Sequence, residues 1–174
     1  MKLINSSSKI ITHTLKDDGR FPNNSLPLII YKDALTLPEK KAATIIITLF
    51  ENNNWKNAWK NGIYDYDHYH SITHEVLGIY CGKAKVQFGG PGGVVEKVRK
   101  GDVIIIPAGV AHRNLGSGKD FKCVGAYPGG NDYDIRKGEE GDRPESDNNI
   151  KKVPMPVSHP ISGIGKMKTI WNDN

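Results

Sequence analysis

Three histidines and a glutamate are crowded into one short segment of the 174-residue chain, at His68, His70, His74 and Glu75. Side chains two residues apart in an extended segment point to the same face, so His68 and His70 can face one point together. A bend across residues 71–73 would bring the Glu75 carboxylate beside both imidazoles. Imidazole and carboxylate ligands together suit borderline divalent metals such as Mn, Fe, Co, Ni or Zn. The segment therefore predicts a metal site that needs a further ligand from elsewhere.

Short strands are the elements that must position these side chains. From residue 62 to 127 the chain consists of short apolar runs cut by glycine-containing turns. Strands at this spacing, with turn residues between them, predict an antiparallel barrel or sandwich. The expected strands span residues 9–15, 28–31, 75–80, 84–88, 94–98, 103–106 and 122–127, with turns at 81–83, 89–93, 100–102 and 115–118.

One helix is expected before the barrel. Pro38 suits a first helical position and Glu39 favours the positive end of the helix dipole, while apolar residues recur through residues 42–50 at helical spacing. The asparagines at residues 52–54 should end this helix, although the isoleucines and threonines at residues 44–48 also suit a strand. Residues beyond 128 are rich in Gly, Pro, Asp and Asn, and we expect them to form loops that lie over the barrel.

The histidine segment resembles the two-part motif of the cupins. That motif reads G-x5-H-x-H-x(3,4)-E-x6-G and then G-x5-P-x-G-x2-H-x3-N, and about 50 residues of this chain follow it in register. The matching residues are Gly62, His68, His70, Glu75 and Gly82, then Gly101, Pro107, Gly109 and His112. The resemblance implies that one divalent transition metal (Fe, Mn, Ni or Zn) is held by His68, His70, Glu75 and His112. The last motif position is Gly116 instead of Asn, and Asn114 is the nearest candidate to replace it.

Longer stretches resemble the YjlB-type bacterial cupins, among them residues 55–64, 107–113 and 125–130. This resemblance implies a mainly β, single-domain cupin, a double-stranded β-helix or jelly-roll barrel with one or two flanking helices. Residues 1–60 would supply N-terminal strands and the helix, residues 61–128 the barrel with the metal site, and residues 129–174 a loop-rich extension of the same domain. Cupins often dimerise through N-terminal strands, so a homodimer is expected, with residues 9–15 as the pairing segment.

His74 has two interpretations. Strand alternation places it on the face opposite Glu75, where a histidine is more often a hydrogen-bonded partner than a ligand. If the bend after His70 is wider, His74 replaces His68 in the ligand set.

Several aromatic and polar residues are candidates for the substrate side of the site or for the hydrogen bonds around it. Tyr64, Tyr69 and Asn114 belong to this group with His74. Trp55, Trp59 and Tyr64 either line a substrate mouth or pack the helix against the barrel.

Composition excludes several classes of protein. Charged residues make up 25% and hydrophobic residues 37%, which is typical of a folded globular chain. The sequence contains no run of about 18 apolar residues, so we expect no membrane span. The net charge is +5, but the basic residues are scattered, so we expect no nucleic-acid partner. Two cysteines, Cys81 and Cys123, lie in apolar runs and cannot form a disulfide framework, and the first residues lack the apolar core of a signal peptide. We therefore expect a cytoplasmic protein.

Three hypotheses for function follow from a His3Glu site, which leaves about two positions open on an octahedral metal. The first is an enzyme that oxidises a small organic molecule with dioxygen, if the metal is Fe, Mn or Ni. The second is a metal-dependent isomerase or epimerase acting on a sugar. The third is a cupin that binds a small molecule without turnover. The candidates for a general base are Tyr64, Tyr69 and His74.

Overall fold

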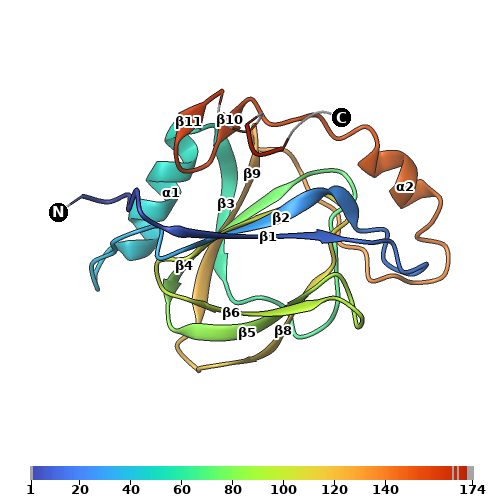
Figure 1. Ribbon diagram of the computed structural model, residues 1–174, viewed down its shortest axis with the longest axis horizontal. Helices are drawn as coiled ribbons and strands as arrows, with labels where there is room; N and C mark the ends of the chain where they lie inside the picture. Colours follow the sequence, from blue (N-terminus) through green and yellow to red (C-terminus); the bar gives the residue numbers. More distant parts are fainter. Residues whose placement is uncertain (1, 166, 168, 172–174) are drawn as a thin grey trace.

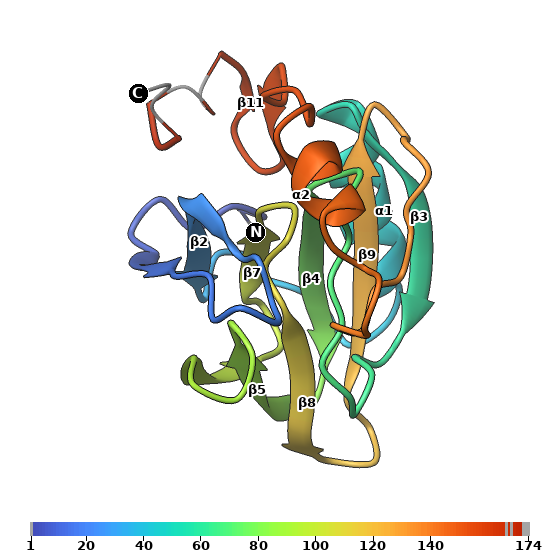
Figure 2. The ribbon, with the colours of Figure 1, turned by 90° about the vertical axis from the view of Figure 1, so that its right-hand side faces the viewer.

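Two antiparallel sheets form the body of the protein, as the computed structural model shows for residues 2–165, 167 and 169–171 (Figure 1). The larger sheet has six strands in the order β1-β2-β7-β4-β9-β3, the smaller has the order β6-β5-β8, and β10 pairs with β11. Figure 2 shows β2, β7, β4, β9 and β3 side by side in that order. The elements are β1 (Lys9–Leu15), β2 (Asn24–Lys32), α1 (Ala42–Asn52), β3 (Trp55–Asn61), β4 (Glu75–Cys81), β5 (Lys83–Phe88), β6 (Val94–Arg99), β7 (Val103–Ile106), β8 (His112–Ser117), β9 (Lys122–Pro128), α2 (Glu145–Ile150), β10 (Ser158–His159) and β11 (Gly163–Ile164). The predicted mainly β jelly roll with one or two flanking helices is confirmed, and the structure has two such helices.

The six-stranded sheet is buried on both faces at its centre. In β2, Leu28 and Ile30 belong to the core between the two sheets, whereas Ile29 and Tyr31 belong to the core on the other side. The helix α1 packs on that second side through residues such as Phe50. Burial on both faces explains why the central strands of this sheet, such as β7 and β4, read as largely apolar runs instead of alternating ones.

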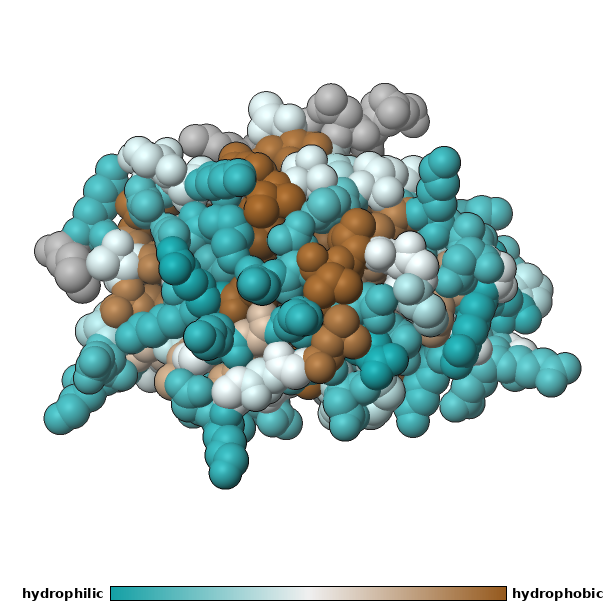
Figure 3. Space-filling model, turned by 60° about the horizontal axis from the view of Figure 1, so that its bottom comes forward, coloured by the Kyte–Doolittle hydropathy of each residue, from teal (hydrophilic) through white to brown (hydrophobic). Residues whose placement is uncertain are grey.

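The three-stranded sheet has one face in solvent. In β5, Ala84, Val86 and Phe88 are buried, while Lys83 and Lys85, which alternate with them, are exposed. The strands β5, β6 and β8 lie at the bottom of Figure 1, and the view that brings this side forward is mostly hydrophilic, with a strip of hydrophobic residues across it (Figure 3). Alternation of this kind is the pattern expected for a sheet with one solvated face.

Some elements differ from their predictions. The helix α1 begins at Ala42 and not at Pro38, because Lys41 has a left-handed backbone conformation (φ 64°) that a continuous right-handed helix does not allow. Among the strands of the two main sheets, β3 and β8 were not predicted. The sequence of β8 contains Gly116 and Ser117, which we had placed in a turn. Of the two cysteines in apolar runs, Cys123 is buried and Cys81 is only partly buried.

The C-terminal segment is more regular than the loops predicted for it. It contains α2 and the short β10–β11 hairpin, and it buries Ile161, Met167 and Trp171 against the α1 side of the large sheet. Within the part of the chain that the structure describes, no helix has the length and apolar character needed to cross a membrane.

Candidate metal centre

Four polar side chains meet in the interior of the barrel. His68, His70, Glu75 and His112 are all buried, with exposed fractions between 2% and 6%. One ring nitrogen from each histidine lies within 4.8 Å of those of the other two. The Glu75 Oε2 atom lies 3.3 Å from Nε2 of His70 and 3.3 Å from Nε2 of His112. The structure therefore brings together the four residues that the sequence singled out.

Strand ends and one glycine bend place these side chains. Glu75 is the first residue of β4, and His112 is the first residue of β8. His68 lies outside the named strands, but it forms an isolated bridge to His112, with backbone N–H···O distances of 3.2 and 2.9 Å. Gly109 has a φ of 87°, and a Cβ atom there would lie 2.5 Å from the Asn23 carbonyl oxygen. Glycine is therefore required at the bend that leads into His112.

The three rings are anchored in the same way. The Nδ1 atom of His68 lies 3.1 Å from the Tyr66 carbonyl oxygen, and Nδ1 of His112 lies 3.1 Å from the Val110 carbonyl oxygen. Nδ1 of His70 is hydrogen-bonded to the Asp134 carbonyl oxygen. A carbonyl oxygen only accepts, so each Nδ1 must carry a proton. A neutral ring then has its lone pair on Nε2, the atom through which it can bind a metal.

Charges inside the cluster are finely balanced. Burial, together with the neighbouring His112, lowers the pKa of His68 to about 3, so this ring is neutral near pH 7. Burial also opposes protonation of His70, but the Glu75 carboxylate outweighs it and raises the pKa of His70. Burial would raise the pKa of Glu75, yet His70 and His112 hold it well below its usual range. A proton on His70 and a metal ion would compete for the same lone pair.

The donor set fits a divalent metal. Oε2 of Glu75 is fully buried and has no hydrogen-bond partner of acceptable geometry among the described residues. An unpaired buried carboxylate oxygen is costly, and a cation at this point would remove the cost. Three imidazoles and one carboxylate are ligands that Mn, Fe, Co, Ni and Zn accept.

A hydrogen-bonded chain that we did not predict holds the other oxygen of Glu75. The Tyr127 hydroxyl donates to Oε1 of Glu75 at 3.1 Å and accepts from Nε1 of Trp59 at 2.8 Å. Burial and the nearby carboxylate raise the pKa of Tyr127, so its hydroxyl stays protonated. The available signal was strand alternation, because Cys123, Gly125 and Tyr127 share one face of β9.

A chamber of about 150 Å³ opens beside the four residues. Tyr127 and Tyr133 form part of its wall and stack on each other, with ring centroids 4.7 Å apart. Of the aromatic residues with two interpretations, Trp59 and Tyr64 line the chamber, and the Tyr64 ring lies 5.1 Å from that of His68. Trp55 instead packs in the core on the α1 side of the large sheet.

Three other candidates lie away from the chamber. His74 is buried on the α1 side of the six-stranded sheet, with its ring centroid 4.8 Å from that of Trp171. The Tyr69 hydroxyl donates to Oγ of Ser146 at 3.0 Å, in a buried position. Asn114 Oδ1 accepts from the Gly116 N–H within β8. None of the three is among the described residues that line the chamber.

Comparisons with known proteins agree with the sequence motif. Residues 44–126 match the family model described as Cupin. The protein YjlB of Bacillus subtilis (strain 168) is 41% identical over 153 residues, which cover 87% of this chain and 90% of YjlB.

Solved structures with a similar chain path have low sequence identity. A DUF861-family protein from Thermotoga maritima is 22% identical and covers 56% of this chain and 96% of its own, with a TM-score of 0.36. The acireductone dioxygenase of Bacillus anthracis was solved with a cadmium ion in its active centre. It is 14% identical, and the match covers 68% of this chain and 77% of the dioxygenase, with a TM-score of 0.39. The dTDP-6-deoxy-D-glucose-3,5-epimerase of Legionella pneumophila is 12% identical, and the match covers 68% of this chain and 71% of the epimerase, with a TM-score of 0.38.

Proposed function

The chain belongs to the cupin family, as one of its YjlB-type members, and from this premise we propose that it is a metal-dependent enzyme that oxidises a small organic molecule with dioxygen. His68, His70, Glu75 and His112 would hold the metal. When bound, a divalent Fe, Mn or Ni ion supplies open coordination positions and the capacity for electron transfer.

One observation carries the proposal. Each of the three histidines has its Nδ1 proton held by a backbone carbonyl, so each neutral ring offers its lone pair from Nε2. The Oε2 atom of Glu75, which accepts no hydrogen bond of acceptable geometry from the described residues, faces the same point. A polar barrel interior without a metal would have no need to present three acceptors and a carboxylate oxygen to each other.

The residues around the chamber favour redox chemistry over isomerisation. An isomerase or epimerase needs a protein group that removes a proton from its substrate. Tyr127 is a poor base, because its hydroxyl already donates to Glu75 and its pKa is raised. Of the three candidate bases in the sequence, His74 lies on the other face of the sheet and the Tyr69 hydroxyl is bonded to Ser146, so Tyr64 is the one that lines the chamber. Oxidation by dioxygen can proceed without such a base.

The same proposal includes a homodimer formed through β1. This strand is at the edge of the large sheet and pairs with β2 alone among the described strands. Ile10 on β1 is 53% exposed. A free strand edge with an exposed apolar residue is suited to pairing with another strand. Sedimentation should give twice the mass of one chain. The substitution Ile10→Lys places a charge on this strand edge and should shift the protein toward the monomer.

Nitric oxide, which occupies the dioxygen position on ferrous sites, tests the proposed chemistry directly. The protein is loaded anaerobically with Fe(II) and exposed to nitric oxide, and the electron paramagnetic resonance spectrum is recorded. We expect the spectrum of a high-spin iron–nitrosyl complex, followed by oxygen uptake when small hydroxy-ketones and hydroxy-acids are screened. A protein that retains Zn alone and binds no nitric oxide when loaded with iron would instead support non-redox chemistry.

A further inference from the structure

Residues 133–147 form a strap that lies along the segment carrying His68 and His70. The strap pairs with this segment at one point, where Tyr69 and Arg136 exchange two backbone hydrogen bonds of 2.9 Å. Tyr69 stands between the two histidines in the sequence. We propose that the strap positions His70 for the metal and that Asp134 is the positioning residue. This inference rests on the proposed metal site.

Asp134 holds both the ring and the backbone at this ligand. Its carbonyl oxygen accepts the Nδ1 proton of His70. Its carboxylate accepts the backbone N–H of Ser71 at 2.7 Å and the Ser71 hydroxyl at 2.5 Å. Nε of Arg136 donates to the same carboxylate at 2.9 Å and keeps it in place. One residue therefore fixes the orientation of the ring, its tautomer and the chain direction immediately after it.

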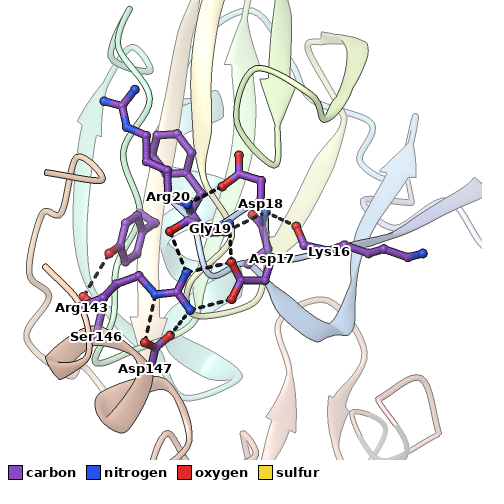
Figure 4. A network of polar contacts seen from close by, with 11 residues as sticks. Lys16, Asp17, Asp18, Gly19, Arg20, Arg143, Ser146 and Asp147 are labelled. Atoms are coloured by element: carbon purple, nitrogen blue, oxygen red, sulfur yellow. Dashed lines mark hydrogen bonds and ion pairs between the residues drawn. The ribbon is translucent and has the colours of Figure 1, made fainter. Parts of the chain in front are cut away.

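A clasp of charged residues fastens the other end of the strap. The guanidinium of Arg143 binds two carboxylates at once, that of Asp17 at 2.7 and 2.5 Å and that of Asp147 at 2.9 and 2.8 Å (Figure 4). Asp17 follows β1, and Asp147 lies in α2, so the clasp joins α2 to the turn between β1 and β2. Paired two-point contacts of this kind are both strong and directional.

The helix α2 carries the effect of the clasp back to the histidine segment. Nδ2 of Asn149 donates to the Ser71 hydroxyl at 3.1 Å, and the Tyr69 hydroxyl donates to Ser146 at 3.0 Å. These two contacts involve the residues immediately before and after His70 in the chain. The strap also brings Tyr133 to the chamber wall. A loosened strap would free the His70 ring to carry its proton on either nitrogen, and the lone pair on Nε2 would then be lost part of the time.

The first test measures the His70 ring in the metal-free protein. Long-range proton–nitrogen NMR correlation reports which ring nitrogen carries the proton, and it needs no bound metal. Asp134→Ala should shift the ring nitrogen signals of His70, while those of His112, which is anchored by Val110, stay in place. Asp134→Asn keeps one carbonyl-type oxygen for the Ser71 N–H and should restore part of the wild-type signal. An overall loss of structure would move both histidines together.

The second test measures the affinity for Co(II) by titration of its visible spectrum. Loss of an outer partner of a ligand typically weakens metal binding by about 10- to 100-fold, and we expect that loss for Asp134→Ala. Asp132→Ala removes the same charge from an exposed position in the preceding loop and should leave the affinity unchanged. Arg143→Ala should also weaken binding, but less than Asp134→Ala does. Lys152→Ala removes the same charge from an exposed position and should leave the affinity unchanged.

The outcomes separate the two proposals. If the wild-type protein binds Co(II) while Asp134→Ala binds it equally well with unchanged His70 signals, the strap proposal is overturned and the metal site stands. If the wild-type protein binds no Co(II), the metal site fails. In that case an Asp134-dependent His70 signal would still show that the strap orients the ring.

Discussion

The two sides of the six-stranded sheet both bury histidines, and they hold the rings in opposite ways. Inside the barrel, Nδ1 of His68, His70 and His112 faces a backbone carbonyl. On the other side, Nδ1 of His74 accepts from the Ala108 N–H at 2.9 Å, and Nδ1 of His159 accepts from two backbone N–H groups. When neutral, the first three rings offer Nε2 as an acceptor, whereas the last two carry their proton on Nε2.

The difference teaches how to separate a ligand from a core histidine. Burial alone does not do so, because His74 is as buried as His112, each with 2% exposure. The backbone partner of Nδ1 does, because it decides whether Nε2 has a lone pair to offer. The neighbours agree with this assignment: Nε2 of His159 faces the Tyr31 hydroxyl at 2.8 Å, and His74 packs on Trp171.

The largest effect we expect is on metal content. His112→Ala removes one of four ligands and should reduce the bound metal from about one equivalent to none, because the remaining donors no longer surround the ion. His74→Ala is the matched control from the other side of the sheet, and it should keep the full equivalent. Elemental analysis of both purified variants checks this. Equal loss in the two variants would break the distinction between the two sides.

The free energy of unfolding of the metal-free protein should show the reverse pattern, with a larger loss for His74→Ala than for His112→Ala. His74→Ala removes a buried ring that packs on Trp171 and leaves the Ala108 N–H without its acceptor. Loss of buried contacts and of one hydrogen bond should lower the free energy of unfolding by about 2–4 kcal/mol. Urea denaturation of the metal-free proteins measures it. A metal-free His74→Ala protein as stable as the wild type would contradict this role.

The acid dependence of stability should also depend on His74. Burial lowers its pKa from 6.5 to about 4, so between these values the unfolded chain binds a proton that the folded chain does not. The stability that the neutral ring provides is therefore complete above pH 6.5 and is lost as the pH falls toward 4, by up to about 1.4 kcal/mol per pH unit. His74→Gln should flatten this slope in the metal-free protein. An unchanged slope would show that His74 does not titrate as its burial requires.

The smallest effect is expected from Tyr127→Phe. The variant keeps the ring that stacks on Tyr133 but removes the hydroxyl between Glu75 and Trp59. The loss of such a hydrogen bond should cost about 1 kcal/mol of stability. Metal affinity should fall several-fold while the equivalent is retained, which titration with Co(II) measures. A loss as large as that of His112→Ala would mean that Tyr127 itself belongs to the ligand set.

The sequence predicted the centre of the site better than its surroundings. His68, His70 and Glu75 were identifiable because they share one short extended segment, whereas His112 was identified through the resemblance to the two-part cupin motif. Asp134 was not, because it follows His70 by 64 positions in a segment with no strand or helix pattern, and only the folded chain brings the two together. That the four residues bind a metal stays a prediction.

The strands were predictable where burial imposed a pattern. The strand β7 was predicted to the residue because both of its faces are buried, which makes it a continuous apolar run. The strand β3 was missed because it is an edge strand with the sequence WKNAWKN, in which polar residues outnumber apolar ones. Its pairing with β9 is also irregular between Lys56 and Trp59, where Asn57 has a left-handed conformation. Such a bulge disrupts the period of two that marks a strand.

The metal content of the purified protein is the most direct test of the central claim. The protein is stripped with a chelator, reconstituted separately with Fe(II), Mn(II), Ni(II) and Zn(II), desalted and analysed for each element. We predict about one equivalent per chain of at least one redox-active metal, retained through desalting, as a buried site with three imidazoles and one carboxylate should hold it. A chain that retains none of the four metals after reconstitution would contradict the account.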